Sequence, residues 1–349
     1  MKISFYYLVI VLFLCSCANI IIPSGGEKDV IAPILLKTHP PDKGLNFKES
    51  KITFHFNENI QENKWSDFFY ISPLLGKNTR YKINNKTATI FLEDTLENNT
   101  TYSLHLNHCI KDVNEGNILE KLEYLFSTSN NIDTLKINGK LIDAKALEPK
   151  INTWVFLQKE DLEDSLCFKT KPLYVTKSDE NGYFVFDNLD EKDYKIFSIS
   201  GLDFVYHEGD KLGFINKLVS SINDSNLTIY LFDPLYEHKL NDTKDSLLQS
   251  DSALVGNITI TSNLDANIIV QLFQDQQLKK EISFKNSPYI INDIKAGEYD
   301  IYLIVDNNKN NLWDTGSFIL RKLPETIYRY KETLNIRTNW NLEIDWHIN

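Results

Sequence analysis

The chain has 349 residues, of which 42% are hydrophobic and 24% are charged, and its formal net charge is -11. This composition is typical of a folded globular protein, and the length allows two or three domains. Because nucleic-acid affinity depends on Lys and Arg side chains that neutralise phosphates, the acidic balance argues against a nucleic-acid partner. The chain has 13 Gly and 1 Met but 17 Tyr and 20 Phe, in runs mixed with Ile, Thr and Asn, which predicts an all-β fold.

The first residues have the plan of an export signal. Lys2 precedes an apolar core from about Phe5 to Leu14, which is shorter than the roughly 20 residues that a membrane-spanning helix needs. The core ends in the run LCSC, which closes at Cys17. We therefore expect residues 1–16 to be a signal peptide. The alternative is an ordinary secreted protein in which the cysteines of this run are incidental.

The run LCSC resembles the lipobox of bacterial lipoproteins. The resemblance implies that a diacylglyceryl group is attached to the Cys17 thiol, that the chain is cut before Cys17, and that the new amino group is acylated, as with palmitate. Two or three acyl chains anchor a protein stably, whereas one binds only marginally. Alanine rather than aspartate follows Cys17, which implies the outer membrane, facing either the periplasm or the cell surface. Residues 17–32 are then a lipidated tether.

The remaining cysteines, Cys109 and Cys167, are too few for a disulfide scaffold of the small secreted type. They are either two buried free thiols or one disulfide bridge. His105 and His108 lie close to Cys109 in sequence, but on a strand their spacing does not suit a zinc site and a fourth ligand is missing nearby.

Residues 33–129 alternate apolar and polar side chains with a period of two, which predicts strands that each bury one face. In the run KITFHFNENI, the side chains of Ile52, Phe54 and Phe56 point one way and the polar residues between them point the other. Turn-forming runs such as PPDKG and NNKT separate these strands, as in a β-sandwich.

This segment resembles the bacterial Ig-like domain of SbsA-type S-layer proteins. The resemblance is carried, in family order, by Pro33 with the following ILLKTHPPDKG and by the runs ITFHFNENI, LEDTLENNTTYSLHL and IKDVNEGNILEKLEYLFST. It implies an Ig-like sandwich, a domain type that serves mostly as a spacer or an adhesive module.

Residues 134–236 predict a second β-unit. The run SDENGYFVFDNLDEKDYKIFSI has an Asn181-Gly182 pair between strand patterns, which is a strong hairpin signal because both residues tolerate the positive φ of a type I′ turn. Together with Gly139 and the run INTWVFL, this run resembles the carboxypeptidase regulatory-like, transthyretin-like sandwich. Asp193 stands where that family usually has Gly before the Tyr, which leaves the geometry of that turn open.

Residues 237–253 are polar and lack a strand period, so we expect a linker there. Residues 254–349 then repeat the second unit, because six apolar positions recur at a constant offset of 105 residues. These positions are Phe184, Phe186, Leu189, Tyr194, Ile196 and Ile199 in the first copy and Tyr289, Ile291, Ile294, Tyr299, Ile301 and Ile304 in the second. Gly139 recurs as Gly256. The sequence therefore predicts three tandem β-sandwiches, the last two of which share a fold.

The sharpest candidate for a ligand site is the run DNNKNNLWD. Its oxygen donors have the spacing of a calcium loop, since a hard cation takes six to eight oxygens from a tightly curled segment. The donors would be Asp306, Asn308, Asn310, Asp314 and the main-chain carbonyl of Leu312. Asn311 replaces the usual sharp-turn glycine, and Ser317 replaces the bidentate Glu. The alternative is an Asn-rich turn that hydrogen-bonds its own backbone, and no other cofactor is expected.

Aromatic side chains are a second candidate. Flat rings can bind sugars or a partner protein if they are exposed, and otherwise they are core residues. The candidates are Trp65, Phe68, Phe69, Tyr70 and Trp313. The sequence offers no nucleophile elbow, zinc-protease helix, Walker loop or dinucleotide-binding fingerprint, so we do not expect an enzyme.

Signal, tether, Ig-like unit and transthyretin-like units together resemble a family of Bacteroidetes Ig-like domain lipoproteins, whose ending is matched by VDNNKNNLWDTG, RKLPETIYRY and NWNLEIDW. The resemblance implies an architecture rather than an activity. We expect a non-enzymatic outer-membrane lipoprotein that acts as a spacer or protein-interaction scaffold. Its expected partners are the membrane, through the N-terminal lipid, and an envelope protein or polysaccharide. The alternative is a glycan-binding outer-membrane lipoprotein that uses exposed aromatics.

Overall fold

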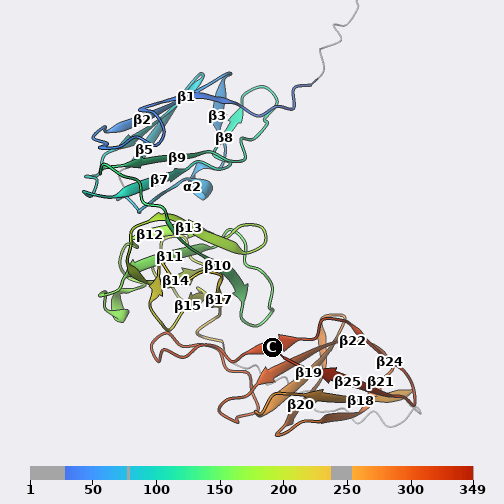
Figure 1. Ribbon diagram of the computed structural model, residues 1–349. Helices are drawn as coiled ribbons and strands as arrows, with labels where there is room; N and C mark the ends of the chain where they lie inside the picture. Colours follow the sequence, from blue (N-terminus) through green and yellow to red (C-terminus); the bar gives the residue numbers. More distant parts are fainter. Residues whose placement is uncertain (1–27, 77–78, 237–253, 349) are drawn as a thin grey trace, which may run out of the picture.

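The computed structural model describes residues 28–76, 79–236 and 254–348, and the regular structure of these residues is almost all β-strand. The strands form three β-sandwich units that follow one another along the molecule (Figure 1). The all-β fold expected from the sequence is therefore confirmed. The expected signal peptide, residues 1–16, and the expected linker, residues 237–253, lie outside the described residues.

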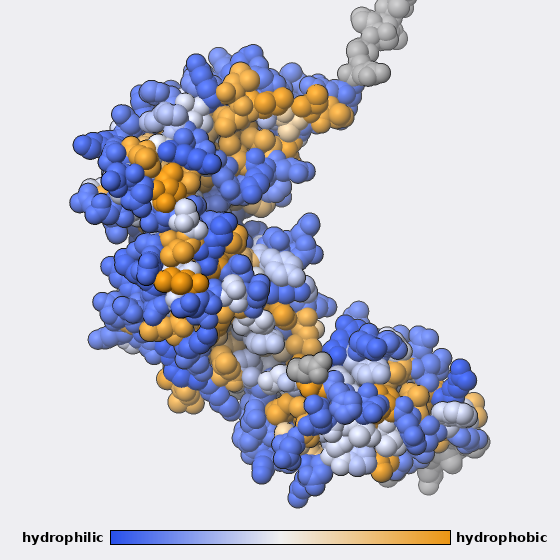
Figure 2. Space-filling view, viewed as in Figure 1, coloured by the Kyte–Doolittle hydropathy of each residue, from blue (hydrophilic) through white to orange (hydrophobic). Residues whose placement is uncertain are grey.

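Apolar surface is distributed unevenly over the molecule. Most of the face drawn in Figure 2 is hydrophilic, and separate apolar patches interrupt it. No helix within the described ranges has both the length and the apolar character needed to cross a membrane.

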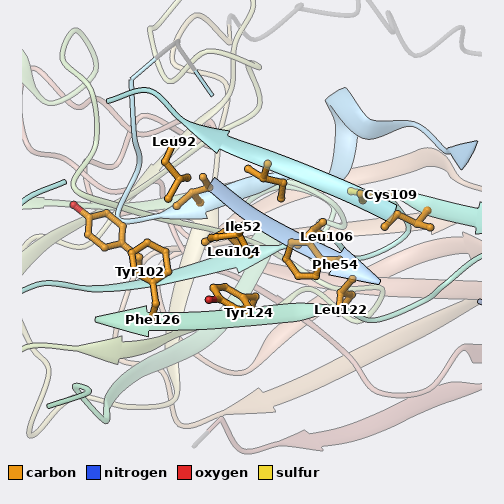
Figure 3. Close-up of a cluster of buried hydrophobic side chains, with 14 of the residues drawn as sticks. Ile52, Phe54, Leu92, Tyr102, Leu104, Leu106, Cys109, Leu122, Tyr124 and Phe126 are labelled. Carbon is orange, nitrogen blue, oxygen red and sulfur yellow. The ribbon is translucent and has the colours of Figure 1, made fainter. Parts of the chain in front are cut away.

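Unit one packs its sheets around a single core. The sheets are β1 (Leu35–His39), β2 (Lys51–Phe56), β6 (Thr87–Leu92) and β5 (Thr79–Asn84); β4 (Tyr70–Ser72), β7 (Thr101–His105) and β9 (Glu123–Ser127); and β3 (Ile60–Glu62) with β8 (Ile110–Asp112). On β2, Ile52, Phe54 and Phe56 are buried, as the alternation predicted. The ring of Phe54 meets that of Tyr124 on β9 edge to face, at 5.6 Å between centroids (Figure 3). Each fully buried side chain of this size stabilises the fold by roughly 1.5–3 kcal/mol.

Unit two has a three-stranded sheet and a larger one. The small sheet is β13 (Tyr183–Leu189), β10 (Leu135–Asp143) and β17 (Leu227–Leu231); the large sheet is β12 (Tyr174–Lys177), β11 (Trp154–Lys159), β14 (Asp193–Ile199) and β15 (Leu212–Phe214), with β16 (Val219–Ser220) also paired to β14. The last strand, β17, runs parallel to the first strand, β10.

Unit three repeats this order strand for strand. Its small sheet is β21 (Tyr289–Lys295), β18 (Val255–Ser262) and β25 (Asn341–Trp346); its large sheet is β20 (Gln277–Phe284), β19 (Ile268–Gln274), β22 (Gly297–Val305) and β23 (Ile327–Arg329), with β24 (Leu334–Ile336) also paired to β22. Its last strand is again parallel to its first. The repeat expected from the constant offset is therefore seen in the topology.

The repeated glycine has a structural reason. A Cβ at Gly139 would lie 2.4 Å from the carbonyl oxygen of Leu227, and a Cβ at Gly256 would lie 2.3 Å from that of Arg337. In both units only glycine lets the first strand approach the final segment this closely.

The hairpin expected at Asn181-Gly182 is wrong. β12 pairs with β11 and β13 pairs with β10, so the turn connects the two sheets of unit two instead of joining neighbouring strands. Gly182 has a φ of 78°, but Asn181 is not in the left-handed region, which a type I′ turn would require. The carboxylate of Asp179 accepts hydrogen bonds from the backbone N–H groups of Asn181 and Tyr183, both at 2.8 Å, and this Asx turn determines the local geometry.

Candidate functional site

The residues expected to bind lie in different parts of the molecule. Cys17, the expected lipidation site, is outside the described residues. The aromatic run beginning at Trp65 lies in unit one, whereas Trp313 and the expected calcium loop lie in unit three. The structure therefore does not bring the sequence-predicted candidates together at a single site.

The aromatic run does not form an exposed binding surface. Trp65 begins the short helix α2 (Trp65–Phe68) and is only 6% exposed; its ring stacks on that of Tyr81, with the centroids 3.9 Å apart. Phe68 and Phe69 are partly buried against the same core. These rings belong to the core of unit one, which was the alternative interpretation of the sequence.

Tyr70, the last residue of this run, lies at the junction with unit two. Its ring stacks on His105 at 4.3 Å and meets Trp154 of unit two edge to face at 5.5 Å. Burial raises the pKa of Tyr70 to about 12, so its hydroxyl stays protonated at neutral pH. Tyr70 therefore helps to join two units.

Hydrogen bonds align the same junction. The backbone N–H of Leu74 donates to the carbonyl of Leu173 at 3.0 Å, and the side-chain amide of Asn188 donates to the hydroxyl of Ser103 at 3.1 Å. Beside the junction lies a groove of about 710 Å³, whose lining includes His105, Glu123, Lys140, Lys177 and Tyr183. Several of its charges are already paired, as with Lys121 and Glu123 at 3.3 Å.

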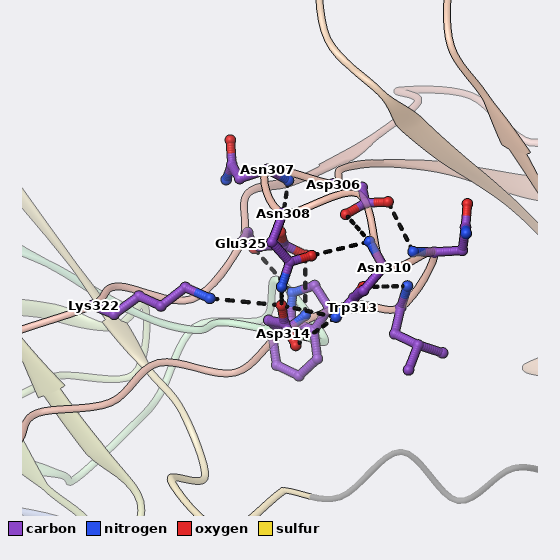
Figure 4. Close-up of polar contacts among 10 residues, drawn as sticks. Asp306, Asn307, Asn308, Asn310, Trp313, Asp314, Lys322 and Glu325 are labelled. Carbon is purple, nitrogen blue, oxygen red and sulfur yellow. Dashed lines mark hydrogen bonds and ion pairs between the residues drawn. The ribbon is translucent and has the colours of Figure 1, made fainter. Parts of the chain in front are cut away.

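The run from Asp306 to Asp314 forms a closed loop held by its own hydrogen bonds (Figure 4). The carboxylate of Asp306, which is 2% exposed, accepts from the backbone N–H groups of Asn310 and Asn311 at 3.2 and 2.9 Å. The side-chain oxygen of Asn310 accepts from the N–H of Leu312 at 2.7 Å. The side-chain amides of Asn308 and Asn310 donate to the carboxylate of Asp314, and so they present N–H groups to it.

The donor set of this loop is only partly arranged for an ion. Its carboxylates and amides are the oxygen ligands that calcium prefers, but in this conformation they are engaged in the turn itself. Among the residues that the structure describes, no three His, Cys, Asp or Glu side chains form a group that could hold a metal ion. Calcium binding by Asp306, Asn308, Asn310, Leu312 and Asp314 therefore stays a prediction, which is tested below.

Glu325 completes the loop and was not predicted from the sequence. Its two carboxylate oxygens accept the backbone N–H groups of Asn307 and Asp314 at 2.7 and 3.0 Å, and its carbonyl accepts the indole N–H of Trp313 at 2.9 Å. Burial raises the pKa of Glu325, and the neighbouring charges of Asp314 and Asp306 act in the same direction. Glu325 lies eleven positions after Asp314, which is too far for a local sequence pattern to indicate this contact.

The segment from Asp306 to Glu325, which we call the junction loop, packs on unit two. Phe318 lies among Phe168, Phe197 and Phe214, with ring centroids 5.0, 5.6 and 5.3 Å apart. Trp313 is 5% exposed and meets Tyr236 at 5.3 Å, so this ring too is unavailable as an exposed binding surface. The junction loop of unit three thus covers part of the outer face of the large sheet of unit two, beside Phe168 of unit two itself.

The sequence carried a signal for this contact. Strand β14 is buried at five of its last six positions, with the pattern eBiBBBB over Asp193–Ile199, and β11 is buried at four successive positions. Strands buried on both faces have nearly continuous apolar runs instead of alternation. The runs INTWVFL and KIFSI therefore indicate a sheet that needs a cover on its second face.

The remaining thiols are free and separate within the described residues. Cys109 lies in the core of unit one and Cys167 lies at the unit two side of the junction loop, and both are buried. Burial raises the pKa of Cys109 to about 12, so it behaves as a small apolar side chain.

Residues 29–128 match the family model of the bacterial Ig-like domain Big_5. Unit one is therefore similar to the bacterial Ig-like domain over nearly its whole length. The match confirms the Ig-like resemblance of this segment. The resemblance of units two and three to the carboxypeptidase regulatory-like sandwich stays a prediction. None of the curated proteins matches the chain.

Several solved structures share a remote likeness. The Bacillus anthracis TIE protein is 11% identical, with a TM-score of 0.18, over 94% of this chain and 59% of that one. The N-terminal part of the bacterial S-layer protein SbsC is 13% identical, with a TM-score of 0.20, over 58% of this chain and 43% of that one. BcpA, the major pilin subunit of Bacillus cereus, is 12% identical, with a TM-score of 0.20, over 56% and 68%. The chain therefore matches about three fifths or less of the first two proteins, and these likenesses support no statement about function.

Proposed function

We propose that this protein is a non-enzymatic lipoprotein of the cell envelope that acts as a spacer or protein-interaction scaffold. In this proposal, the lipidated Cys17 holds the chain at the outer membrane, on the periplasmic or the cell-surface side. Its partners are the membrane, through that lipid, and an envelope protein or polysaccharide bound by the sandwich units.

The observation that carries the proposal is the way in which the units are joined. Phe318 of unit three fills the aromatic face of unit two, and Tyr70 of unit one packs against Trp154 of unit two. Both junctions bury aromatic rings and are supported by hydrogen bonds or ion pairs. Sandwich units joined in this way keep fixed positions relative to one another. A chain of such units can therefore hold its two ends a set distance apart, as a spacer must.

The lowered pKa of the buried carboxylate of Asp143 also supports a structural role. Asp143 is 4% exposed and contacts the ammonium groups of Lys150 and Lys211 at 2.9 and 2.8 Å. Burial opposes its ionisation, but backbone N–H groups and the two ammonium groups outweigh burial and hold the pKa of Asp143 well below its usual range. A carboxylate held ionised by fixed partners stabilises the fold and is a poor proton donor or acceptor.

The glycan-binding alternative depended on exposed aromatic rings. Trp65 and Trp313 are 6% and 5% exposed, and their ring faces are packed against other protein side chains. Without those rings, no specific observation favours this alternative over the scaffold.

Mass spectrometry of the protein purified from its own envelope tests the anchor. We expect the mature N-terminal peptide to begin at Cys17 and to carry two or three acyl chains. Cys17→Ser should leave the protein at precursor length and without acyl chains. An unmodified N-terminal peptide, or a Cys17→Ser chain that is still cut to mature length, would contradict the proposal.

A further inference from the structure

Exposed aliphatic side chains gather at one end of unit one, next to the point where the described chain begins. Val30, Ile31 and Ile34 come from the first described segment, and Val113 and Ile118 come from the loop after β8. These five side chains, which we call the apolar end, are between 41% and 78% exposed. In Figure 2 this end of unit one is an apolar area beside the start of the described chain.

Hydrogen bonds hold the two segments of the apolar end together. The side-chain amide of Asn117 donates to the carbonyl oxygens of Asp29 and Ile31, at 3.1 and 3.2 Å. Asn57 holds Ile34 from the other side, since its side-chain oxygen accepts from the N–H of Ile34 at 2.7 Å and its N–H donates to the carbonyl of Ile34 at 3.1 Å. The first segment is therefore fixed against the body of unit one.

The loop that presents Val113 and Ile118 is itself pre-formed. The carboxylate of Asp112, 1% exposed, accepts from the backbone N–H groups of Glu115, Gly116 and Asn117 at 2.6, 2.9 and 2.7 Å. Gly116 has a φ of 81°, which suits glycine. A rigid loop that exposes aliphatic side chains loses little conformational entropy when another surface covers them.

We propose that the apolar end docks on the surface of the lipid bilayer to which the protein is anchored. This inference rests on the proposed lipid at Cys17. Only ten residues, 18–27, separate Cys17 from Lys28, so Lys28, two positions before Val30 of the apolar end, can lie at most about 37 Å from the anchored residue. A lipid anchor at this distance raises the effective concentration of the bilayer around the apolar end, so that a weak contact becomes populated.

A bilayer suits this surface better than a second copy of the chain does. A stable protein interface takes roughly 20–30 residues on each side, whereas the apolar end offers five side chains. A bilayer needs no matching shape, and its contact strength increases with each aliphatic group that enters the headgroup region. Docking at this end would fix the angle at which the three units leave the membrane.

The first test uses the mature-length chain with Cys17→Ser, so that no lipid contributes. We expect weak, measurable sedimentation with large vesicles of phosphatidylethanolamine and phosphatidylglycerol. The double variant Ile31→Asp/Val113→Asp should lower the partition coefficient by about tenfold or more. The matched control is Ile319→Asp, since Ile319 is 93% exposed on the junction loop of unit three, and it should change nothing. Circular dichroism melts check that both variants are folded.

The second test uses the native lipidated protein in the same vesicles. Cys109 and Cys167 are buried, so an environment-sensitive maleimide dye can be directed to Ile118→Cys or, as a control, to Ile319→Cys. We expect a blue shift at position 118 only. Equal partitioning of the wild-type chain and the double variant, or equal dye spectra at both positions, would overturn the proposal. So would a dimer, seen by light scattering without vesicles, that Ile31→Asp/Val113→Asp dissociates.

These outcomes are distinguishable from failure of the anchor. If the N-terminal peptide carries no acyl chains, the proposed function is wrong, but binding of the unlipidated chain to vesicles would still support docking by the apolar end. Conversely, if Cys17 is acylated but the unlipidated chain binds vesicles equally with and without Ile31→Asp/Val113→Asp, only the docking proposal is wrong.

Discussion

Arg321 of unit three and Asp164 of unit two form a bidentate ion pair, although they lie 157 positions apart in the sequence. Nε of Arg321 lies 2.7 Å from one carboxylate oxygen of Asp164, and a terminal guanidinium nitrogen contacts the other oxygen. The guanidinium also lies 4.8 Å from the ring centre of Phe318. One side chain therefore links the charged and the aromatic parts of this junction.

We predict that Arg321→Ala lowers the free energy of unfolding by about 0.5–1 kcal/mol at pH 7, because both partners are partly exposed. The Arg321 guanidinium lowers the pKa of Asp164, so the pair stabilises the fold above the unfolded pKa of about 3.9, and this contribution is lost as pH falls through the lower folded value. Urea unfolding at pH 7 and at pH 2 measures the difference. The control is Lys331→Ala, which removes an exposed pair with the adjacent Glu332. A larger effect at pH 2 than at pH 7 would refute the assignment.

Phe318→Ala should loosen unit three from unit two. Phe318 is partly buried among three rings, so we expect a loss of about 1–3 kcal/mol, below the full value for a core Phe. Small-angle X-ray scattering should show a broader range of overall molecular dimensions for the variant than for the wild type. Ile319→Ala is the neighbouring control and should leave the scattering curve unchanged, since that side chain is 93% exposed.

Asp143→Asn should destabilise unit two by about 2 kcal/mol at pH 7, since charge-assisted hydrogen bonds to Lys150 and Lys211 are lost in a buried setting. The folded pKa of Asp143 is depressed, so the wild-type advantage is present above about pH 4 and disappears as the carboxylate is protonated. Guanidinium unfolding across pH 2 to 7 follows this change. Asp345→Asn, at an exposed carboxylate, is the control and should change stability little. A pH-independent loss for Asp143→Asn would argue against the ion-pair explanation.

Gly139→Ala and Gly256→Ala test the repeat. In each case the added methyl would overlap a backbone carbonyl oxygen, at 2.4 and 2.3 Å, and we expect each variant to lose more than about 2 kcal/mol. Gly44→Ala is a milder case, because its Cβ would lie 3.3 Å from the carbonyl oxygen of Pro41. Thermal melts compare the three variants. If Gly139→Ala and Gly256→Ala differ widely, the two glycines do not have equivalent roles.

The calcium prediction for the loop from Asp306 to Asp314 is tested by titration calorimetry and by melts with calcium or EDTA. A bound ion should raise the melting temperature of the wild type, since a ligand at 100 times its Kd stabilises the native state by about 2.7 kcal/mol. Asp306→Ala/Asp314→Ala should abolish that shift. Identical wild-type melts with calcium and with EDTA would leave the loop as an Asn-rich turn.

Local patterns predicted the elements of this fold better than they predicted its surfaces. Alternation identified the buried faces of strands such as β2, and the constant offset identified two units with one topology. The Asn181-Gly182 pair misled, because Asp179 determines the turn and the flanking strands belong to different sheets. An Asn-Gly pair indicates that the backbone can turn tightly at that point, but it does not indicate which strands pair with each other.

The binding candidates were harder to predict because exposure depends on contacts between distant units. Trp313 stands near the end of a mostly polar run, yet it is buried within the junction loop, where its indole N–H donates to the carbonyl of Glu325 and its ring meets Tyr236. Local sequence cannot distinguish a ring that faces solvent from one that a neighbouring unit covers. The continuous apolar runs of β11 and β14 were the signal that such a cover was needed.

The parallel pairing of first and last strands has a mechanical consequence. Because β10 and β17 run in the same direction, the chain comes into unit two at one end of the small sheet and leaves it at the other, and β18 and β25 do the same in unit three. A pulling force along the molecule then loads the hydrogen bonds between Gly139–Asp143 and Leu227–Leu231 in shear, all at once. Under tension between an anchored end and a distant partner, such a ladder resists as a whole instead of opening bond by bond.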